Sequence, residues 1–204
     1  MDGVLVDSER FYQQRREAFL KMKGMPIPDR TLLVGANDQR VWELMVPQDE
    51  NLRAVLKEEY QSFRRKHPVP YDKLANPQAK PLFTDLKNRG LKIAIASSSA
   101  KWMIQRMARM LDIADLVDYM ISGMDCSAHK PDPEIYLRAM EALGVMAGEA
   151  AAVEDSPVGI QAALGAGLRV YALRPMGDTV LDQSAATAVL EQLIDLLAYI
   201  GPSR

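Results

Sequence analysis

From Pro81 onward, short apolar runs alternate with amphipathic helical stretches, and this alternation constrains the fold more than any other feature of the sequence. Short apolar runs of this kind are typical of parallel strands that helices bury on both faces. Right-handed βαβ units produce the same order of strand and helix. The sequence therefore predicts an α/β fold with a parallel sheet, whose strands we expect at residues 91–96, 118–122, 150–153 and 168–173.

The part of the chain before residue 80 shows helical periodicity and no strand pattern. Gly24 interrupts a first helical stretch, a second stops at Pro47 and a third ends before Pro68. A chain of 204 residues fits one domain with an insertion better than two full domains. We therefore predict a core domain formed by residues 1–7 and 79–204, interrupted by a helical domain over residues 8–78.

Composition excludes several classes of partner. The 25 lysine and arginine residues nearly balance the 27 aspartate and glutamate residues, so no strong field of one sign would attract nucleic acid or an anionic membrane. A single cysteine, Cys126, cannot form an internal disulfide, and no apolar run approaches the length of a membrane span or a signal sequence. We expect a cytoplasmic protein, a monomer or weak homodimer, with no membrane or nucleic-acid partner.

Polar residues gather directly after the predicted strands. Open α/β sheets bind their ligands at the carboxyl ends of the strands. Helices should begin just beyond, with Ser99, Asp132 and Ser156 as N-caps, the last two followed by proline. The polar segments in question are residues 1–9, 95–99, 129–133 and 153–157.

Taken one at a time, these residues allow ordinary explanations. Ser97 suits a turn after a strand, and Lys130 suits a solvated surface. Adjacent carboxylates such as Glu154 and Asp155 repel each other unless a cation or water relieves them. Magnesium binds one or two carboxylates together with waters and a substrate phosphate, so it would relieve this repulsion. The alternative is a capped loop whose acids simply face a helix N-terminus.

Taken together and in order, the four segments resemble the four motifs of the haloacid dehalogenase-like superfamily, and in particular its beta-phosphoglucomutase-like phosphatases. The resemblance covers nearly the whole chain and implies a Rossmannoid parallel sheet with an inserted helical cap. The first motif of that family reads aspartate, any residue, aspartate, glycine, and residues 1–9 resemble it from its middle residue onward. By this resemblance Asp2 is the general acid and base, and its main-chain carbonyl is a metal ligand.

The resemblance implies roles for the other segments as well. Ser97 would hydrogen-bond the transferring phosphoryl group, Lys130 would offset its charge, and Glu154 and Asp155 would hold Mg²⁺. Phosphoryl transfer requires charge neutralisation and alignment more than covalent assistance, which such a set of groups would supply. A later segment, residues 181–185, also resembles a stretch of some of these phosphatases, without an assigned role.

The aspartate that attacks phosphorus in this family would stand before Met1, at the end of a first core strand that the chain does not contain. We expect a sequence truncated at its N-terminus, so that the full-length form is an enzyme working through a phospho-aspartyl intermediate and the chain as given is inactive. The alternative is a genuine short chain, an inactive relative that binds phosphate or metal.

The substrate expected from the resemblance is a small phosphorylated metabolite, most naturally a sugar phosphate. Beta-phosphoglucomutases carry a histidine and an arginine at cap positions that Tyr12 and Asp38 occupy here, which favours a phosphatase over a phosphohexomutase. Arg40 offers a replacement cation. Candidate substrate contacts are Ser98, Ser99, Lys101 and Arg40, although each charged one also suits an exposed helix surface.

The two tryptophans, Trp42 and Trp102, occur at helical core spacing, and we predict that both pack in the interior.

Overall fold

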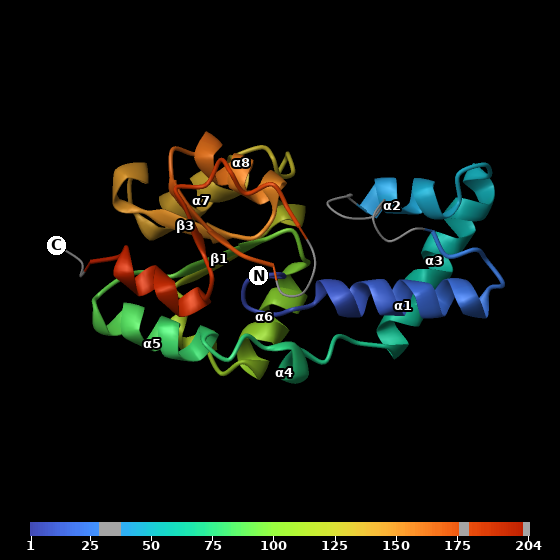
Figure 1. Ribbon diagram of the computed structural model, residues 1–204, viewed down its shortest axis with the longest axis horizontal. Coiled ribbons are helices and arrows are strands. Elements are labelled where there is room, and N and C mark those ends of the chain that lie inside the picture. The colour runs from blue at the N-terminus through green and yellow to red at the C-terminus, as the bar shows by residue number, and fades with distance from the viewer. Residues whose placement is uncertain (29–37, 176–179, 202–204) are drawn as a thin grey trace. The chain divides into compact units, whose positions relative to one another are not determined.

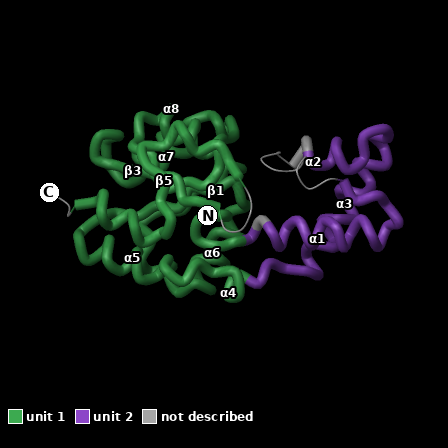
Figure 2. The backbone as a smooth tube through the Cα atoms, viewed as in Figure 1, with its two compact units in different colours: residues 1–7, 71–204 green, residues 8–70 purple. Residues whose placement is uncertain are grey.

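The computed structural model describes residues 1–28, 38–175 and 180–201. The chain divides into two compact units (Figure 2), one formed by residues 1–7 and 71–204 and the other by residues 8–70. The chain therefore leaves the first unit after a few residues and returns to it at Tyr71.

The first unit contains parallel strands. Strand β1 (Ala94–Ser97) pairs with β2 (Tyr119–Ser122), and β3 (Ala151–Glu154) pairs with β4 (Arg169–Leu173), which pairs with β5 (Ala188–Leu190). Within the described residues these strands form two separate parallel sheets, of two and three strands. The α/β class and the four predicted strands are confirmed; the fifth strand, β5, was not predicted because three residues give too short a pattern.

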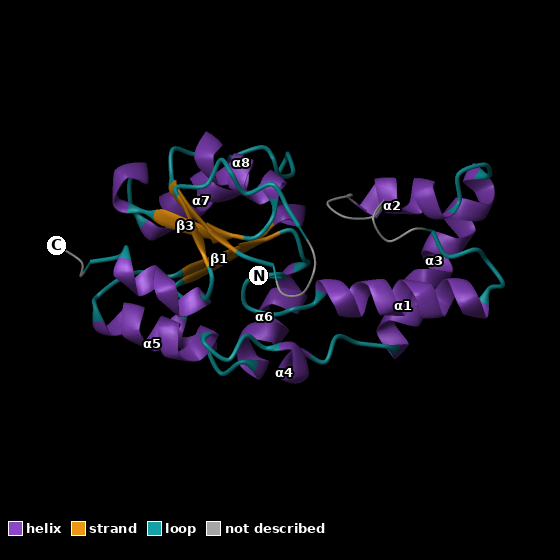
Figure 3. Cartoon of the chain, in the orientation of Figure 1, coloured by secondary structure: helices purple, strands orange, loops and turns teal. Residues whose placement is uncertain are grey.

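Helices cover the strands on both faces (Figures 1 and 3). Helix α7 (Glu134–Leu143) packs against β1 and β2, and α8 (Pro157–Gly165) packs against β3 and β4. Aliphatic side chains fill the space between them, with Ile135, Ile160 and Val170 almost fully buried. Burying such a side chain contributes about 1.5–3 kcal/mol, so this cluster holds the strand ends in place. The other helical elements of this unit are α4 (Tyr71–Leu74), α5 (Ala79–Asn88), α6 (Lys101–Met110), η2 (Ala114–Leu116), η3 (Gly123–Asp125), η4 (Ala147–Glu149) and η5 (Leu193–Ala198).

The second unit is helical, with α1 (Glu9–Met22), α2 (Asp38–Met45) and α3 (Glu50–Lys66). Aromatic rings form its centre: Phe19 and Tyr60 have centroids 5.1 Å apart, and Trp42 and Tyr60 have centroids 5.5 Å apart. Edge-to-face and tilted ring pairs of this kind contribute beyond their buried area. The predicted packing of Trp42 is confirmed.

The prediction that Trp102 packs in the interior is wrong, because 62% of this side chain is exposed. The buried face of α6 is formed by Met103, Ile104, Met107 and Ala108. Successive helical residues are rotated by about 100°, so the residue that precedes this stripe turns away from the interior.

The helix starts beside the predicted site differ in detail from expectation. Ser156 caps α8 as predicted, accepting a hydrogen bond from the Gly159 main-chain nitrogen at 3.2 Å. Helix α7 begins one residue later than expected, with Pro133 as its N-cap residue, although Oδ1 of Asp132 still accepts from the nitrogen of Glu134. Ser99 does not cap α6: the N-cap residue is Ala100.

None of the helices in the described residues has the length and apolar character that a membrane span requires.

Candidate functional site

Two charged side chains, Glu154 and Lys130, meet at the ends of the two sheets of the first unit. Glu154 is the last residue of β3, and its Oε1 accepts a hydrogen bond from Nζ of Lys130 at 2.5 Å. The Tyr136 hydroxyl, from α7, donates to the same oxygen. Nζ of Lys130 also lies 3.4 Å from the carbonyl oxygen of Ala96 in β1 and 3.2 Å from the Tyr136 hydroxyl. Lys130 therefore connects the end of one sheet with the end of the other.

Burial and charge act in opposite directions on this pair of acids. Burial raises the pKa of Glu154, but the positive charges of Lys130 and of the N-terminal amino group outweigh it and hold that pKa below its ordinary value. At Asp155, burial and the charge of Glu154 outweigh the positive charges of the N-terminal amino group and of Lys130, and they raise its pKa to about 6. Burial and the negative charge of Glu154 also raise the pKa of Tyr136, which therefore stays a hydrogen-bond donor.

Each carboxylate lies directly against a glycine. A Cβ at Gly159, in the first turn of α8, would overlap the Glu154 carboxylate, and a Cβ at Gly3 would overlap that of Asp155. Gly3 also has a φ of +72°, a conformation that favours glycine. The sequence thus leaves space around both acids that any other residue would fill.

The N-terminal turn brings Asp2 to the same end of the sheets. Because Gly3 contacts Asp155, the preceding residue lies next to the acidic pair. Oδ2 of Asp2 accepts a hydrogen bond from the Ser99 hydroxyl at 2.9 Å. Asn76 anchors this turn by donating from its side chain to the carbonyl of Val4 at 3.1 Å.

Ser97 ends β1 and is 4% exposed. Its hydroxyl oxygen accepts from the main-chain nitrogen of Ser99 at 3.1 Å, which fixes the turn after the strand. On the neighbouring strand, Ser122 donates from its hydroxyl to the carbonyl of Ser99 at 2.8 Å. Of the predicted substrate contacts, Ser98 and Lys101 are exposed beside this turn, whereas the side chain of Arg40 lies outside the described residues.

The structure thus brings Asp2, Ser99, Lys130, Glu154 and Asp155 to one end of the sheets, with Ser97 enclosed beneath them. No group of three histidine, cysteine, aspartate or glutamate side chains is arranged to hold a metal ion in the part of the chain that is described. Two neighbouring carboxylates, each packed against a glycine, nevertheless suit magnesium, which keeps several waters and takes further oxygens from a phosphate. Glu154 and Asp155 would hold the ion.

Two contributors to this site were missed in the sequence. Tyr136 carries no motif signal beyond its position six residues after Lys130, and its hydroxyl matters only because α7 directs it at Glu154. Gly159 had a weak signal, since glycine in the first turn of a helix lowers helix stability and calls for a packing reason.

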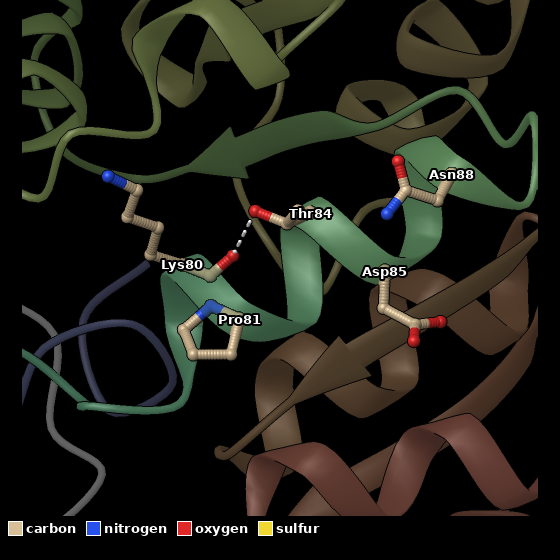
Figure 4. A pocket seen from close by; sticks show the side chains of 5 residues that line it. All are labelled: Lys80, Pro81, Thr84, Asp85 and Asn88. Atoms are coloured by element: carbon tan, nitrogen blue, oxygen red, sulfur yellow. Dashed lines mark hydrogen bonds between the residues drawn. The ribbon is translucent and has the colours of Figure 1, made fainter.

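The surface also has a shallow hollow of about 400 Å³ that lies on α5 (Figure 4), where the Thr84 hydroxyl donates to the carbonyl of Lys80 at 2.9 Å. Its lining residues are Lys80, Pro81, Thr84, Asp85 and Asn88, all from this one helix. None of them belongs to the cluster at the strand ends, so the hollow is not the candidate site.

The family model described as haloacid dehalogenase-like hydrolase matches residues 1–173. A phosphorylated carbohydrates phosphatase from Thermotoga maritima is 27% identical, with 98% of this chain and 96% of that protein aligned. Phosphatase MT3486 from Mycobacterium tuberculosis is 28% identical, over 93% and 94%. The crystal structure of beta-phosphoglucomutase from Clostridium difficile superposes with a TM-score of 0.74 at 21% identity, covering 96% of this chain and 89% of that one.

Proposed function

Because the chain belongs to the haloacid dehalogenase-like hydrolase family, we propose that it provides the site of a magnesium-dependent phosphatase acting on small phosphorylated carbohydrates. The enclosed contact between Lys130 and Glu154, with Asp155 and its glycine-lined space alongside, is the observation that carries the proposal. Fixed opposite charges at one end of a sheet suit the binding of a phosphate together with a divalent cation. The phosphatase from Thermotoga maritima supports the substrate class.

The proposed roles follow from the chemistry of each group. Glu154 and Asp155 would hold Mg²⁺, which when bound neutralises charge on phosphate oxygens. Lys130 offsets further phosphate charge. The Ser97 hydroxyl and main-chain N–H groups of the same turn donate hydrogen bonds to the phosphate oxygens. Asp2, held by Ser99, gives a proton to the leaving oxygen and later takes one from water.

The attacking group in this proposal is an aspartate carboxylate at the position before Met1, as the motif resemblance implies. Its oxygen forms a bond to phosphorus while the ester oxygen departs with the proton of Asp2. Water then attacks the phospho-aspartyl group, Asp2 accepts a proton from that water, and inorganic phosphate leaves. Hydrolysis is thus proposed for a chain that carries this aspartate.

The test is phosphate release from an aryl phosphate and from sugar phosphates, with and without Mg²⁺. It is applied to residues 1–204 and to the same chain extended by an apolar strand that ends in aspartate. Asp155→Asn in the extended chain should lose the magnesium-dependent release of phosphate. Asp72→Asn, at an exposed residue, is the control and should keep it. Absence of magnesium-dependent release from the extended chain would refute the proposal.

A second candidate is a phosphohexomutase, favoured by the structural likeness to beta-phosphoglucomutase. A mutase must hold a second phosphate, for which Arg40 is the proposed cation. Conversion of a sugar 1-phosphate into its 6-phosphate without release of inorganic phosphate would favour this candidate over hydrolysis.

We also propose a cytoplasmic location, as the composition predicts.

A further inference from the structure

Gln183 is buried in the segment between β4 and β5, with 7% of its side chain exposed. Its amide nitrogen donates one hydrogen bond to the main-chain oxygen of Asp155 at 2.7 Å and another to that of Leu173 at 2.8 Å. A carboxamide nitrogen carries two hydrogens. Both are therefore directed at main-chain carbonyls, one of which belongs to the acidic pair.

The two carbonyls lie where the pairing of β3 and β4 stops. The register pairs Glu154 with Ala172 as the last partners, so Asp155 and Leu173 are the next residue on each strand. The Gln183 amide joins the two strands at this point and takes the place of one further hydrogen-bonded pair. Buried carbonyls that lack a partner destabilise a fold, so this bridge also satisfies them.

The segment that carries Gln183 is itself held at a second place. The main-chain nitrogen of Thr187 donates to the carbonyl of Val170 at 2.7 Å, and its hydroxyl accepts from the nitrogen of Val170 at 3.2 Å. The nitrogen of Ala186 donates to the carbonyl of Gln183 at 3.1 Å. The amide is thus presented by a fixed main chain.

We propose that Gln183 is a positioning residue, which sets the main chain at Asp155 and thereby the direction of the carboxylate that faces a bound cation. The inference rests on the proposed function for its metal. A neutral donor suits this task, because a lysine in its place would add charge beside Asp155 and Glu154. Groups that orient a metal ligand from behind commonly change metal affinity by about 10-fold to 100-fold when they are removed.

The test compares two variants of the full chain. Gln183→Met keeps the side-chain length and removes both donors. Thr187→Val removes a hydrogen bond from the same segment at the other end of β4. It therefore controls for effects that any loosening of this segment would cause. The probes are binding of Mg²⁺ alone, measured by calorimetry, and metal-free amide exchange over residues 155–158, read at Asp155, Ser156 and Val158 because Pro157 has no amide hydrogen.

We expect Gln183→Met to weaken Mg²⁺ binding by about 10-fold or more and to speed exchange at residues 155–158. Thr187→Val should change Mg²⁺ affinity by no more than about twofold, since it lies apart from the acids. Equal exchange at residues 155–158 in both variants overturns the inference, and faster exchange with unchanged affinity overturns its link to the metal. If the unaltered chain binds no Mg²⁺ while exchange is selectively faster in Gln183→Met, the link to the metal is overturned and the positioning of the main chain at Asp155 stands, whereas the proposed function is decided separately by phosphate release from the extended chain.

Discussion

The ammonium group of Lys130 lies 2.5 Å from Oε1 of Glu154, and both side chains are nearly enclosed, with exposed fractions of 11% and 8%. The Tyr136 hydroxyl donates to the same oxygen. A buried ion pair adds little net stability, but removal of one partner is costly because the other charge stays buried without compensation. The pair therefore makes the site sensitive to loss of either member.

Replacement of Lys130 by Met should strongly destabilise the fold. The Glu154 carboxylate would stay enclosed without its cation, and we expect a loss of about 3–5 kcal/mol in the free energy of unfolding. Urea unfolding at neutral pH measures this change. Lys87→Met is the matched control, since its ion pair with Asp118 is about one-third exposed and should be worth no more than about 1 kcal/mol. Equal losses in the two variants would contradict the view of Lys130 as a buried partner.

Tyr136→Phe tests the second donor. The substitution removes only the hydroxyl and leaves Oε1 of Glu154 with Lys130 alone, so we expect a loss of about 1–2 kcal/mol in the free energy of unfolding. Tyr199→Phe, at a tyrosine that is 47% exposed, should change stability by less than about 0.5 kcal/mol. A Tyr136→Phe variant as stable as the unaltered protein would show that the hydroxyl contributes nothing there.

The parts of the fold that sequence predicted well are those set by apolar periodicity. The predicted strand at residues 168–173 agrees with β4 within one residue. The strand expected from residue 91 begins instead at Ala94, because Asp118 accepts the main-chain hydrogen of Ile93 through its side chain at 2.7 Å, in place of a ladder bond. Periodicity cannot show such a side-chain substitute for pairing.

The candidate site was predicted from motif order, and its supporting contacts were not. Lys130 and Glu154, which belong to two of the motifs, are in contact. The residues that support them, Tyr136 and Gln183, lie in no recognisable sequence motif. Gln183 binds main-chain carbonyls, which every residue has, so only the folded path of the chain selects its partners. Trp102 illustrates the opposite error, since its helical spacing suggested burial, whereas its direction on α6 leaves it exposed.

The stability of the metal-free protein should depend on pH through Asp155. Burial and the charge of Glu154 raise the pKa of Asp155 from 3.8 to about 6, so the folded form binds its proton more tightly than the unfolded form. The stabilisation from this proton is fully present below pH 3.8 and is lost as pH rises through about 6. Its size is on the order of 3 kcal/mol.

Asp155→Asn should therefore become more stable relative to the unaltered protein as pH rises from 4 to 7. Urea unfolding of both proteins across that range, without divalent cations, measures the difference. Asp182→Asn is the control: hydrogen bonds from Ser184 lower the pKa of Asp182, so its ionisation is complete throughout the upper part of the range. A difference for Asp155→Asn that stays constant with pH would show that Asp155 has an ordinary pKa.

Gly159→Ala tests whether space beside Glu154 is required. Alanine is the better helix former by about 1 kcal/mol, so propensity alone predicts a gain in stability. The added Cβ would instead overlap a carboxylate that Lys130 and Tyr136 hold in place, and we expect a net loss of about 1–3 kcal/mol. Gly148→Ala is the control, because a Cβ there meets no atom within 4 Å. If Gly159→Ala were as stable as Gly148→Ala in urea unfolding, the Glu154 carboxylate would have to be free to move, and the fixed geometry argued for the acidic pair would be wrong.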